Sequence, residues 1–470
     1  MKKKLSILAV AMLSMALASC GPNDNSGGEL TGTALDVSLA SKMTKQELME
    51  ASKKEFEENP SGTFKVVGLT SVLKKIAATV AEQCDWIHYG GENDNVNVNN
   101  SYKDYQLLTA LNSADKSYVA DYALVQDVRY FSTYIEDGIT HNYVPSDYAA
   151  IGLKEGDTLP LKGVHFNKLF WTNTNFEAVN GFKLHNIWQM TTSAKEAAKE
   201  DYISKVSFQT PKTEQINMSF LVTAYAEANQ ARIEAAYQKY FGKAWASETY
   251  HSAGEQWVTE FIANISRWHA SDGTAMKETQ LNDDWNEGYV YYGAFAKMKD
   301  AVSKFYTVDL NNDGTIADDE ELEVTCDGVT YEYSNAANGG DGVRAMDTVK
   351  WDWKIDGFNG FMYCMDSQVI NNAQFPYTAC LFARVMLEEG AYTNAIYNKD
   401  NPDAAGNPAN QYGYYYPGTA SADFRYAKGD WTKEQHIERE LNEDYSYLKA
   451  VRPSLVNIIG TMVDQNAASK

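Results

Sequence analysis

The chain has 470 residues, of which 44% are hydrophobic and 22% charged, the proportions of a globular protein with room for two or three domains. Its 63 acidic residues outnumber its 41 basic residues, which gives a formal net charge of −22. Nucleic acids and anionic lipid surfaces bind basic patches, so this balance argues against both, and we expect no nucleic-acid partner.

The first residues have the order of a secretory signal. A cationic segment, "MKKK", precedes a short apolar run, and small residues stand directly before Cys20. Residues 17–20, "LASC", resemble the bacterial lipobox, which implies cleavage before Cys20 and lipidation of its sulfur. The alternative is an ordinary signal peptide with a coincidental cysteine. We therefore expect a signal peptide over 1–19, a flexible polar tether over 20–42 and an extracytoplasmic, lipid-anchored body.

Strand and helix patterns alternate along the body. Thr44 and Glu47 form a capping box that starts a helix. Residues 63–69 predict a strand that runs straight into a helix over 70–83. Further elements are expected as strands over 121–127 and 205–209 and as helices over 218–241 and 253–269. This alternation predicts an α/β fold with a largely parallel sheet.

No catalytic motif stands out in the chain. The sequence lacks a GxSxG elbow, an HExxH pair, a P-loop and a GxGxxG fingerprint, and its seven histidines are scattered. We therefore predict that the protein is not an enzyme. Because carboxylates are abundant, a glycosidase-type acid pair stays open as an alternative.

Residues 309–320, "DLNNDGTIADDE", match the spacing of an EF-hand calcium loop. Calcium takes six to eight oxygen ligands, which a tight loop must direct inward. The expected ligands are Asp309, Asn311, Asp313, the Thr315 carbonyl and Glu320. The alternative is a turn rich in Asn, Asp and Gly that binds nothing. Calcium sensors carry paired loops between amphipathic helices, so this single loop predicts a structural calcium ion.

Residues 306–347 interrupt the α/β alternation and are expected to be an insertion. Besides Cys20, the chain has Cys84, Cys326, Cys364 and Cys380, with no CxxC pair. An extracytoplasmic compartment permits disulfides among these four. The alternative is four free buried thiols.

Four stretches together resemble bacterial extracellular solute-binding proteins of ABC transporters, in the subgroup similar to iron-, thiamine- and polyamine-binding proteins. They are residues 48–80, 105–147, 186–211 and 369–389, and their order matches the family. The insertion at 306–347 and the segment 86–100 depart from the family's pattern.

The resemblance implies a two-lobed fold of the periplasmic-binding-protein type with a hinge, plus the inserted calcium loop. The expected division assigns 43–135 and 357–470 to lobe one and 136–356 to lobe two. The implied function is capture of a small ligand between the lobes and its delivery to an ABC permease.

The resemblance also implies a set of ligand-facing residues: Thr70, Ser71, Gln126 and Asp127 from lobe one, Asn173, Trp188 and Phe208 from lobe two, and Trp353 and Asp356 at the crossover. Two alternatives stay open. Thr70 could be only a helix cap, and Trp188 and Phe208 could be only core packing.

The ligand class is open at this point. A helix N-terminus at Ser71 suits an anion, whereas Asp127 and Asp356 suit a cation. The runner-up function is a glycan-binding or glycan-degrading surface lipoprotein, which a carboxylate pair or a wide aromatic platform would favour.

Overall fold

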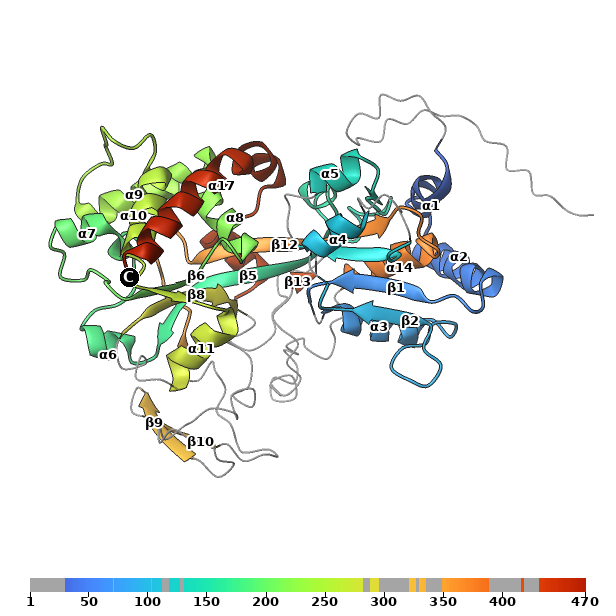
Figure 1. Cartoon of the computed structure of the whole chain (residues 1–470), viewed down its shortest axis with the longest axis horizontal. Helices are drawn as coiled ribbons and strands as arrows, with labels where there is room; N and C mark the ends of the chain where they lie inside the picture. Colours follow the sequence, from blue (N-terminus) through green and yellow to red (C-terminus); the bar gives the residue numbers. More distant parts are fainter. Residues whose placement is uncertain are drawn as a thin grey trace, which may run out of the picture.

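The computed structural model of the chain describes residues 30–70, 72–102, 104–111, 118–126, 131–281, 288–295, 321–326, 329–334, 349–388, 416–417 and 431–470. In this part, twelve strands form one sheet whose main path is β2-β1-β3-β12-β5-β8-β6-β7. Figure 1 shows that the sheet spans two bodies placed side by side.

Each body contains three parallel strands in a mirrored order. Lobe one is built on β2 (Val96–Asn99), β1 (Phe64–Gly68) and β3 (Tyr122–Val125). Lobe two is built on β7 (Arg267–His269), β6 (Val206–Gln209) and β8 (Val290–Ala294). The predicted strands at 63–69, 121–127 and 205–209 are confirmed, and so is the α/β class.

Two long strands run through both lobes. They are β5 (Lys162–Asn173) and β12 (Gly360–Ile370), which pair with each other antiparallel. The far part of β12 pairs antiparallel with β3 in lobe one, and the far part of β5 pairs antiparallel with β8 in lobe two. The sheet is therefore mixed, and the prediction of a largely parallel sheet is wrong. Figure 1 shows both strands passing from one body to the other. All eleven residues of β12 are buried, so any polar side chain on this strand lies out of bulk water.

Helices cover both faces of lobe one. They are α1 (Gly32–Ala40), α2 (Lys45–Glu58), α3 (Val72–Gln83), α4 (Asp104–Leu111), α5 (Phe131–Glu136) and α14 (Pro376–Met386). The predicted capping box is confirmed, because the Thr44 side chain accepts from the Glu47 amide and the Glu47 side chain accepts from the Thr44 amide. α14 packs against α1, α2 and α3.

The predicted tether is too long. Residues 20–29 lie outside the described residues, but α1 begins at Gly32 and packs against α14. Val37 and Ala40 are buried in this contact. Burial of these apolar side chains offsets the entropy that keeps a polar linker disordered, so a tether reaching to residue 42 is wrong.

Lobe two is covered by α6 (Phe176–Asn180), α7 (Thr192–Glu196), α8 (Gln215–Ala224), α9 (Glu227–Phe241), α10 (Ala253–Asn264), α11 (Asp272–Leu281) and α17 (Tyr445–Ala468). An aromatic core fills it, in which Phe208 and Phe220 both stack on Tyr292. The helix predicted over 218–241 is broken between α8 and α9. The helix predicted over 253–269 ends at Asn264.

Two boundaries of the predicted division differ from the structure. Residues 142–158 stay with lobe one, where the Ser146 amide donates to the Ser41 carbonyl and Arg384 pairs with Asp147. The C-terminal helix α17 instead packs on α8 and α10 of lobe two. The Trp268 indole of β7 donates to Asn466 of α17 at 3.0 Å, which fixes the end of the chain there.

Smaller elements complete the described chain. They are η2 (Glu155–Asp157), η3 (Ile187–Met190), α16 (Lys433–Arg439), β4 (Thr140–His141), β11 (Val349–Lys350), β13 (Tyr416–Pro417), β14 (Leu441–Asn442) and the hairpin of β9 (Glu321–Cys326) and β10 (Val329–Ser334). The predicted calcium loop, residues 309–320, lies outside the described residues. Among the described helices, none is both long and apolar enough to cross a membrane.

Three cysteines have described side chains. Cys84, Cys364 and Cys380 are all buried and free. The sequence left disulfides and free thiols as alternatives, and for these three cysteines the structure shows free thiols.

Candidate functional site

The parallel strands of the two lobes end facing each other. Val125, the last residue of β3, pairs with Asp366 of β12. Ala294, the last residue of β8, pairs with Lys168 of β5, which is itself opposite Phe361 of β12. The carboxyl ends of β3 and β8 are therefore separated by the length of β12 between Phe361 and Asp366. Five residues of strand span about 17 Å. Ligands of α/β proteins bind at such carboxyl ends.

We call this span, residues 361–366 of β12 and 162–168 of β5, the central gap. On the β12 side, β3 runs antiparallel and β14 runs parallel to β12. Because the two strands point at each other, the residues that follow them, Gln126 and Glu443, approach the gap from opposite lobes. The Gln126 amide donates to Asp104 Oδ2 at 3.1 Å, and Glu443 Oε2 accepts from the Cys364 amide at 3.0 Å.

Asp366 is the unusual group of the central gap. Its side chain has 2% of its surface exposed, and its Oδ1 is buried without a hydrogen-bond partner. Burial raises the pKa of this carboxyl well above its ordinary value, and the negative charge of Glu443 raises it further. Lys162 acts in the opposite direction, but its ammonium is already paired with Asp157 at 2.9 Å.

Lys168 is the buried cation on the other side of the gap. Its Nζ donates to Asn217 Oδ1 at 3.0 Å and lies 3.2 Å from Asp272 Oδ2. Asn217 and Asp272 lie in the first turns of α8 and α11. The charge of Lys168 is therefore balanced within lobe two. Beside it, burial lowers the pKa of His269 to about 4, so this imidazole is neutral at physiological pH.

The predicted residues of lobe one lie at its carboxyl edge. Thr70 follows β1, is 8% exposed, and accepts from the Val72 amide at 3.3 Å. This contact is the helix-cap role that the sequence left open. Gln126 follows β3 and borders the central gap. Ser71 and Asp127 lie outside the described residues.

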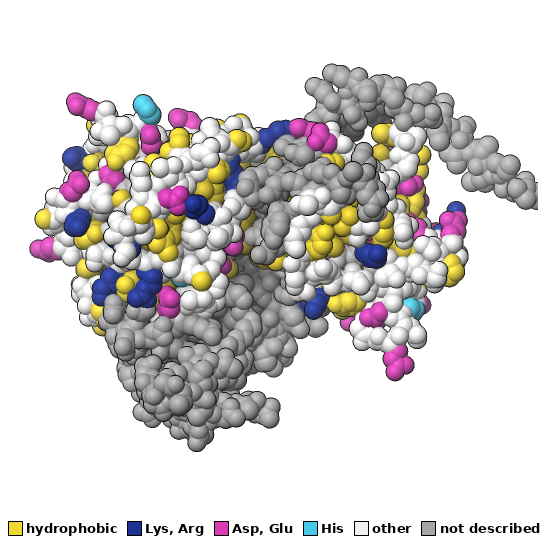
Figure 2. Space-filling view, viewed as in Figure 1, with side chains coloured by type: hydrophobic (Ala, Val, Ile, Leu, Met, Phe, Trp, Pro, Cys, Tyr) yellow, Lys and Arg dark blue, Asp and Glu magenta, His cyan; other side chains and the backbone are white. Residues whose placement is uncertain are grey.

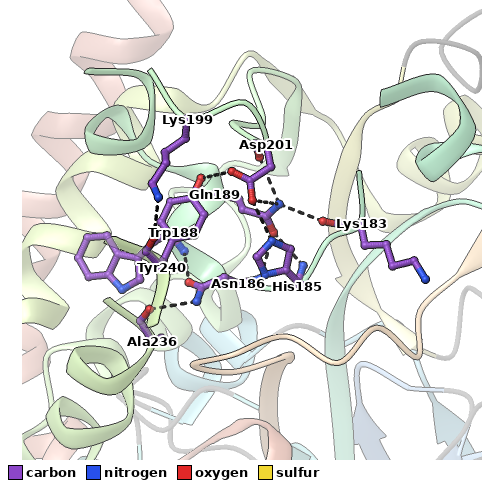
Figure 3. A network of polar contacts seen from close by, with 9 residues as sticks. All are labelled: Lys183, His185, Asn186, Trp188, Gln189, Lys199, Asp201, Ala236 and Tyr240. Atoms are coloured by element: carbon purple, nitrogen blue, oxygen red, sulfur yellow. Dashed lines mark hydrogen bonds and ion pairs between the residues drawn. The ribbon is translucent and has the colours of Figure 1, made fainter. Parts of the chain in front are cut away.

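Trp188 and Phe208 lie in the core of lobe two. Both have 0% of their surface exposed. Figure 3 shows the polar network around η3, in which Asn186 Nδ2 donates to the Ala236 carbonyl at 3.0 Å. The Trp188 indole donates to the Ile233 carbonyl at 3.1 Å. Trp188 and Phe208 are packing residues, which corrects their assignment to the ligand site.

The rest of this network lies nearer the surface. Asp201 accepts from Tyr240 at 2.8 Å and lies 2.8 Å from His185 Nε2, whose side chain is 45% exposed. Figure 3 shows the Tyr240 and His185 side chains converging on the Asp201 carboxylate. Because each group contacts a neighbour on η3 or α9, the network fastens this segment to lobe two.

Asn173, Trp353 and Asp356 lie away from the central gap. Thr172, next to Asn173, pairs with Val290, which is the first residue of β8 rather than the last. The Trp353 indole donates to Thr172 Oγ1 at 3.1 Å. Asp356 pairs with Lys239 of α9 at 2.8 Å. All three contacts connect elements of lobe two, so these residues do not join Gln126 at the gap.

Sequence reasoning missed Asp366, Glu443 and Lys168. The sequence does carry a signal for Asp366 and Lys168, because each charged residue interrupts a run that is otherwise mostly apolar. The runs are "FMYCMDSQVI" for Asp366 and "HFNKLFW" for Lys168. Such a residue on a buried strand needs a partner or a ligand. Glu443 gave no such signal, since it stands in the polar segment "NEDY".

The exposed surface has mixed charge. On the face drawn in Figure 2, acidic and basic side chains of the described residues are interspersed over both lobes, with hydrophobic side chains between them. This mixture is that of a solubilising surface.

Comparison with solved structures identifies the architecture. The BlMnBP1 binding protein of an ABC transporter from Bifidobacterium animalis subsp. lactis, in complex with mannobiose, aligns with a TM-score of 0.51 and 11% sequence identity, over 92% of this chain and 95% of that chain. The chain has the fold of a solute-binding protein. The prediction of a two-lobed, periplasmic-binding-protein-like fold is confirmed.

Two further structures align with lower scores. A Trichodesmium protein (IdiA, FutA) in complex with iron and citrate has a TM-score of 0.46 at 11% identity, over 86% of this chain and 99% of that chain. A Bordetella ferric binding protein has a TM-score of 0.47 at 13% identity, with the same coverage. No protein-family model and no curated protein matches the sequence.

Proposed function

We propose that this chain is a solute-binding protein that captures a small ligand between its lobes and delivers it to an ABC permease, without catalysis. The observation that carries this proposal is the central gap, where the carboxyl ends of β3 and β8 face each other across β5 and β12. A ligand in this gap contacts both lobes only when they are close together. Its binding therefore shifts the population toward a closed form, which a permease can distinguish from the open form.

The solute-binding fold alone does not define the ligand. The structural neighbours are complexes with mannobiose in one case and with iron and citrate in another. One architecture thus serves a neutral sugar and a metal chelate, so the ligand class of this chain depends on its own side chains in the gap.

The function can be tested with a panel of small molecules and the mature chain. We expect one ligand class to raise the melting temperature and to reduce the radius of gyration measured by small-angle X-ray scattering, while the ligand is recovered unchanged. If no small molecule stabilises the protein and a polysaccharide is hydrolysed, the transport proposal is wrong and the glycan-degrading alternative is favoured.

We further propose that the protein is held to the outer side of a bacterial membrane through a lipid on Cys20. The support is the order of signal, lipobox-like "LASC" and polar linker in the sequence. Substitution Cys20→Ser is expected to release the protein from the membrane fraction and to abolish incorporation of an alkyne-labelled fatty acid. Retention of the label in this variant would refute the anchor.

We also propose that residues 309–320 bind one structural calcium ion, supported by the ligand spacing in the sequence. Chelation with EGTA is expected to lower the melting temperature of the wild type and to leave that of Asp313→Ala unchanged. Equal shifts in both proteins would place the effect of EGTA elsewhere.

A further inference from the structure

We propose that the exposed face of α1 rests on the lipid surface of the membrane that holds the protein, so that lobe one lies against the bilayer. This inference rests on the proposed lipid anchor at Cys20. It goes beyond that anchor, because a lipid on a linker leaves the orientation of the folded body undefined.

α1 has an exposed apolar stripe. Leu35 is 40% exposed and Leu39 is 37% exposed. Residues four apart lie on the same side of a helix, so these two side chains are neighbours, and Leu30, which is 44% exposed, stands just before the helix. Among the described residues, seven large hydrophobic side chains are exposed, and three of them fall within residues 30–39. The exposed apolar surface is therefore concentrated at this segment.

The other side of α1 attaches the helix to lobe one. Val37 and Ala40 are buried, and α1 contacts α14 and β4. β4 pairs with Val369 and Ile370, the end of β12 that is remote from lobe two. Figure 1 shows α1 on the side of lobe one away from lobe two. A surface that contacts the exposed stripe of α1 therefore lies away from the central gap.

The segment is nearly free of charge, although the chain is strongly acidic. Residues 30–41 contain one charged residue, Asp36. Its Oδ1 accepts from the Tyr377 hydroxyl of α14 at 3.3 Å, so this carboxylate is held against the body. The next charged residue is Lys42, which is exposed. An apolar stripe followed by a cation suits a neutral phospholipid surface, where the leucines contact acyl chains and the ammonium reaches phosphate groups.

The short linker keeps the bilayer within reach of α1. Nine residues, 21–29, separate Cys20 from Leu30. A linker of this length spans at most about 35 Å when fully extended. Because the lipid is fixed at one end of the linker and α1 at the other, docking takes place at a high effective concentration. Two partly exposed leucines, too few to hold a free protein on a membrane, suffice for docking under this constraint.

The test is photo-crosslinking of the mature chain to lipid. The chain with Cys20→Ser carries an N-terminal histidine tag and is captured on phosphatidylcholine vesicles that contain a nickel-chelating lipid. Benzoylphenylalanine is placed at Lys42 or, as the matched control position, at Lys243, an exposed lysine of lobe two. After illumination, mass spectrometry counts the lipid adducts. We expect adducts at position 42 and only background at position 243.

Substitution of the stripe should remove these adducts. Gln keeps the length and the helix propensity of Leu but not its apolar surface. Leu35→Gln/Leu39→Gln is expected to lower the adducts at position 42 at least about threefold, because two apolar contacts with lipid are lost. Val179→Gln/Ile458→Gln is the matched control, since these side chains are 43% and 50% exposed on α6 and α17 of lobe two. It should leave the adducts unchanged.

Melting temperatures show whether each variant is folded, and the single substitutions are measured as well. Equal adducts with and without the stripe, at equal melting temperature, overturn the inference, and so does the absence of adducts at position 42. Sedimentation analysis tests another occupant of the face. A wild type that dimerises through Leu35 and Leu39, so that Leu35→Gln/Leu39→Gln is monomeric, would assign the face to a second copy of the chain and overturn the lipid contact.

The docking and the anchor fail separately. Capture on the vesicles uses the histidine tag and does not need a lipid on the chain. Absence of fatty acid on Cys20 in cells therefore refutes the anchor, whereas the vesicle experiment decides whether α1 contacts lipid.

Discussion

Asp366 and Lys168 occupy equivalent places on the two crossing strands, opposite the last residues of β3 and β8. Each is 2% exposed. Lys168 is balanced by Asp272 within lobe two, whereas Asp366 Oδ1 is buried without a hydrogen-bond partner. The mirrored sheet thus places one buried cation and one buried carboxyl group at the two ends of the gap, and burial raises the pKa of that carboxyl.

Asp366→Asn is expected to stabilise the unliganded protein at pH 8 and not at pH 4. The folded-state pKa of Asp366 is raised, so the folded state favours the protonated form and loses stability as the pH rises through that pKa. A neutral amide costs less to bury than an unpaired carboxylate, by roughly 1–3 kcal/mol. Urea unfolding of both proteins at the two pH values measures the difference. A variant that is less stable at pH 8 would show that the wild-type carboxylate has a partner.

Much of each lobe could be predicted from local patterns. The strand of residues 64–68 and the helix that follows it, and the capping box of Thr44 and Glu47, depend on neighbours in the sequence. Trp268 shows where such patterns fail. It continues the apolar stripe of α10 at helical spacing, yet it lies in β7, because residues 267–269 complete the parallel sheet beside β6.

The candidate site could be predicted only in part, since it is assembled by strand register rather than by local pattern. Gln126 was found because it follows a recognisable strand. Asp366 and Glu443 come close to it only through the pairing of β12 with β3 and β14. The aromatic candidates Trp188 and Phe208 were wrong because an aromatic residue in a core and one in a binding site have the same local sequence pattern.

The thiols of Cys84, Cys364 and Cys380 are expected to be unreactive in the native protein and fully reactive after unfolding. Burial raises the pKa of Cys84 to about 11 and raises the pKa of the other two thiols, and the thiolate is the form that reacts. Iodoacetamide should label these three peptides at least roughly tenfold faster in urea without reductant than in buffer. Peptide mass spectrometry measures this. A peptide that is labelled only after reduction would contradict the free thiols.

Phe208→Ala is expected to lower stability without changing ligand affinity. Phe208 is fully buried, with its ring 5.0 Å from Tyr292 and 5.4 Å from Phe261. Removing such a ring leaves a cavity and costs about 3–5 kcal/mol of unfolding free energy, whereas Phe208→Leu, which fills most of the volume, should cost less than about 1.5 kcal/mol. Urea unfolding measures both, and calorimetry with a ligand identified in the small-molecule panel checks affinity. A Phe208→Leu variant that unfolds like the wild type but binds that ligand much more weakly would return Phe208 to the ligand site.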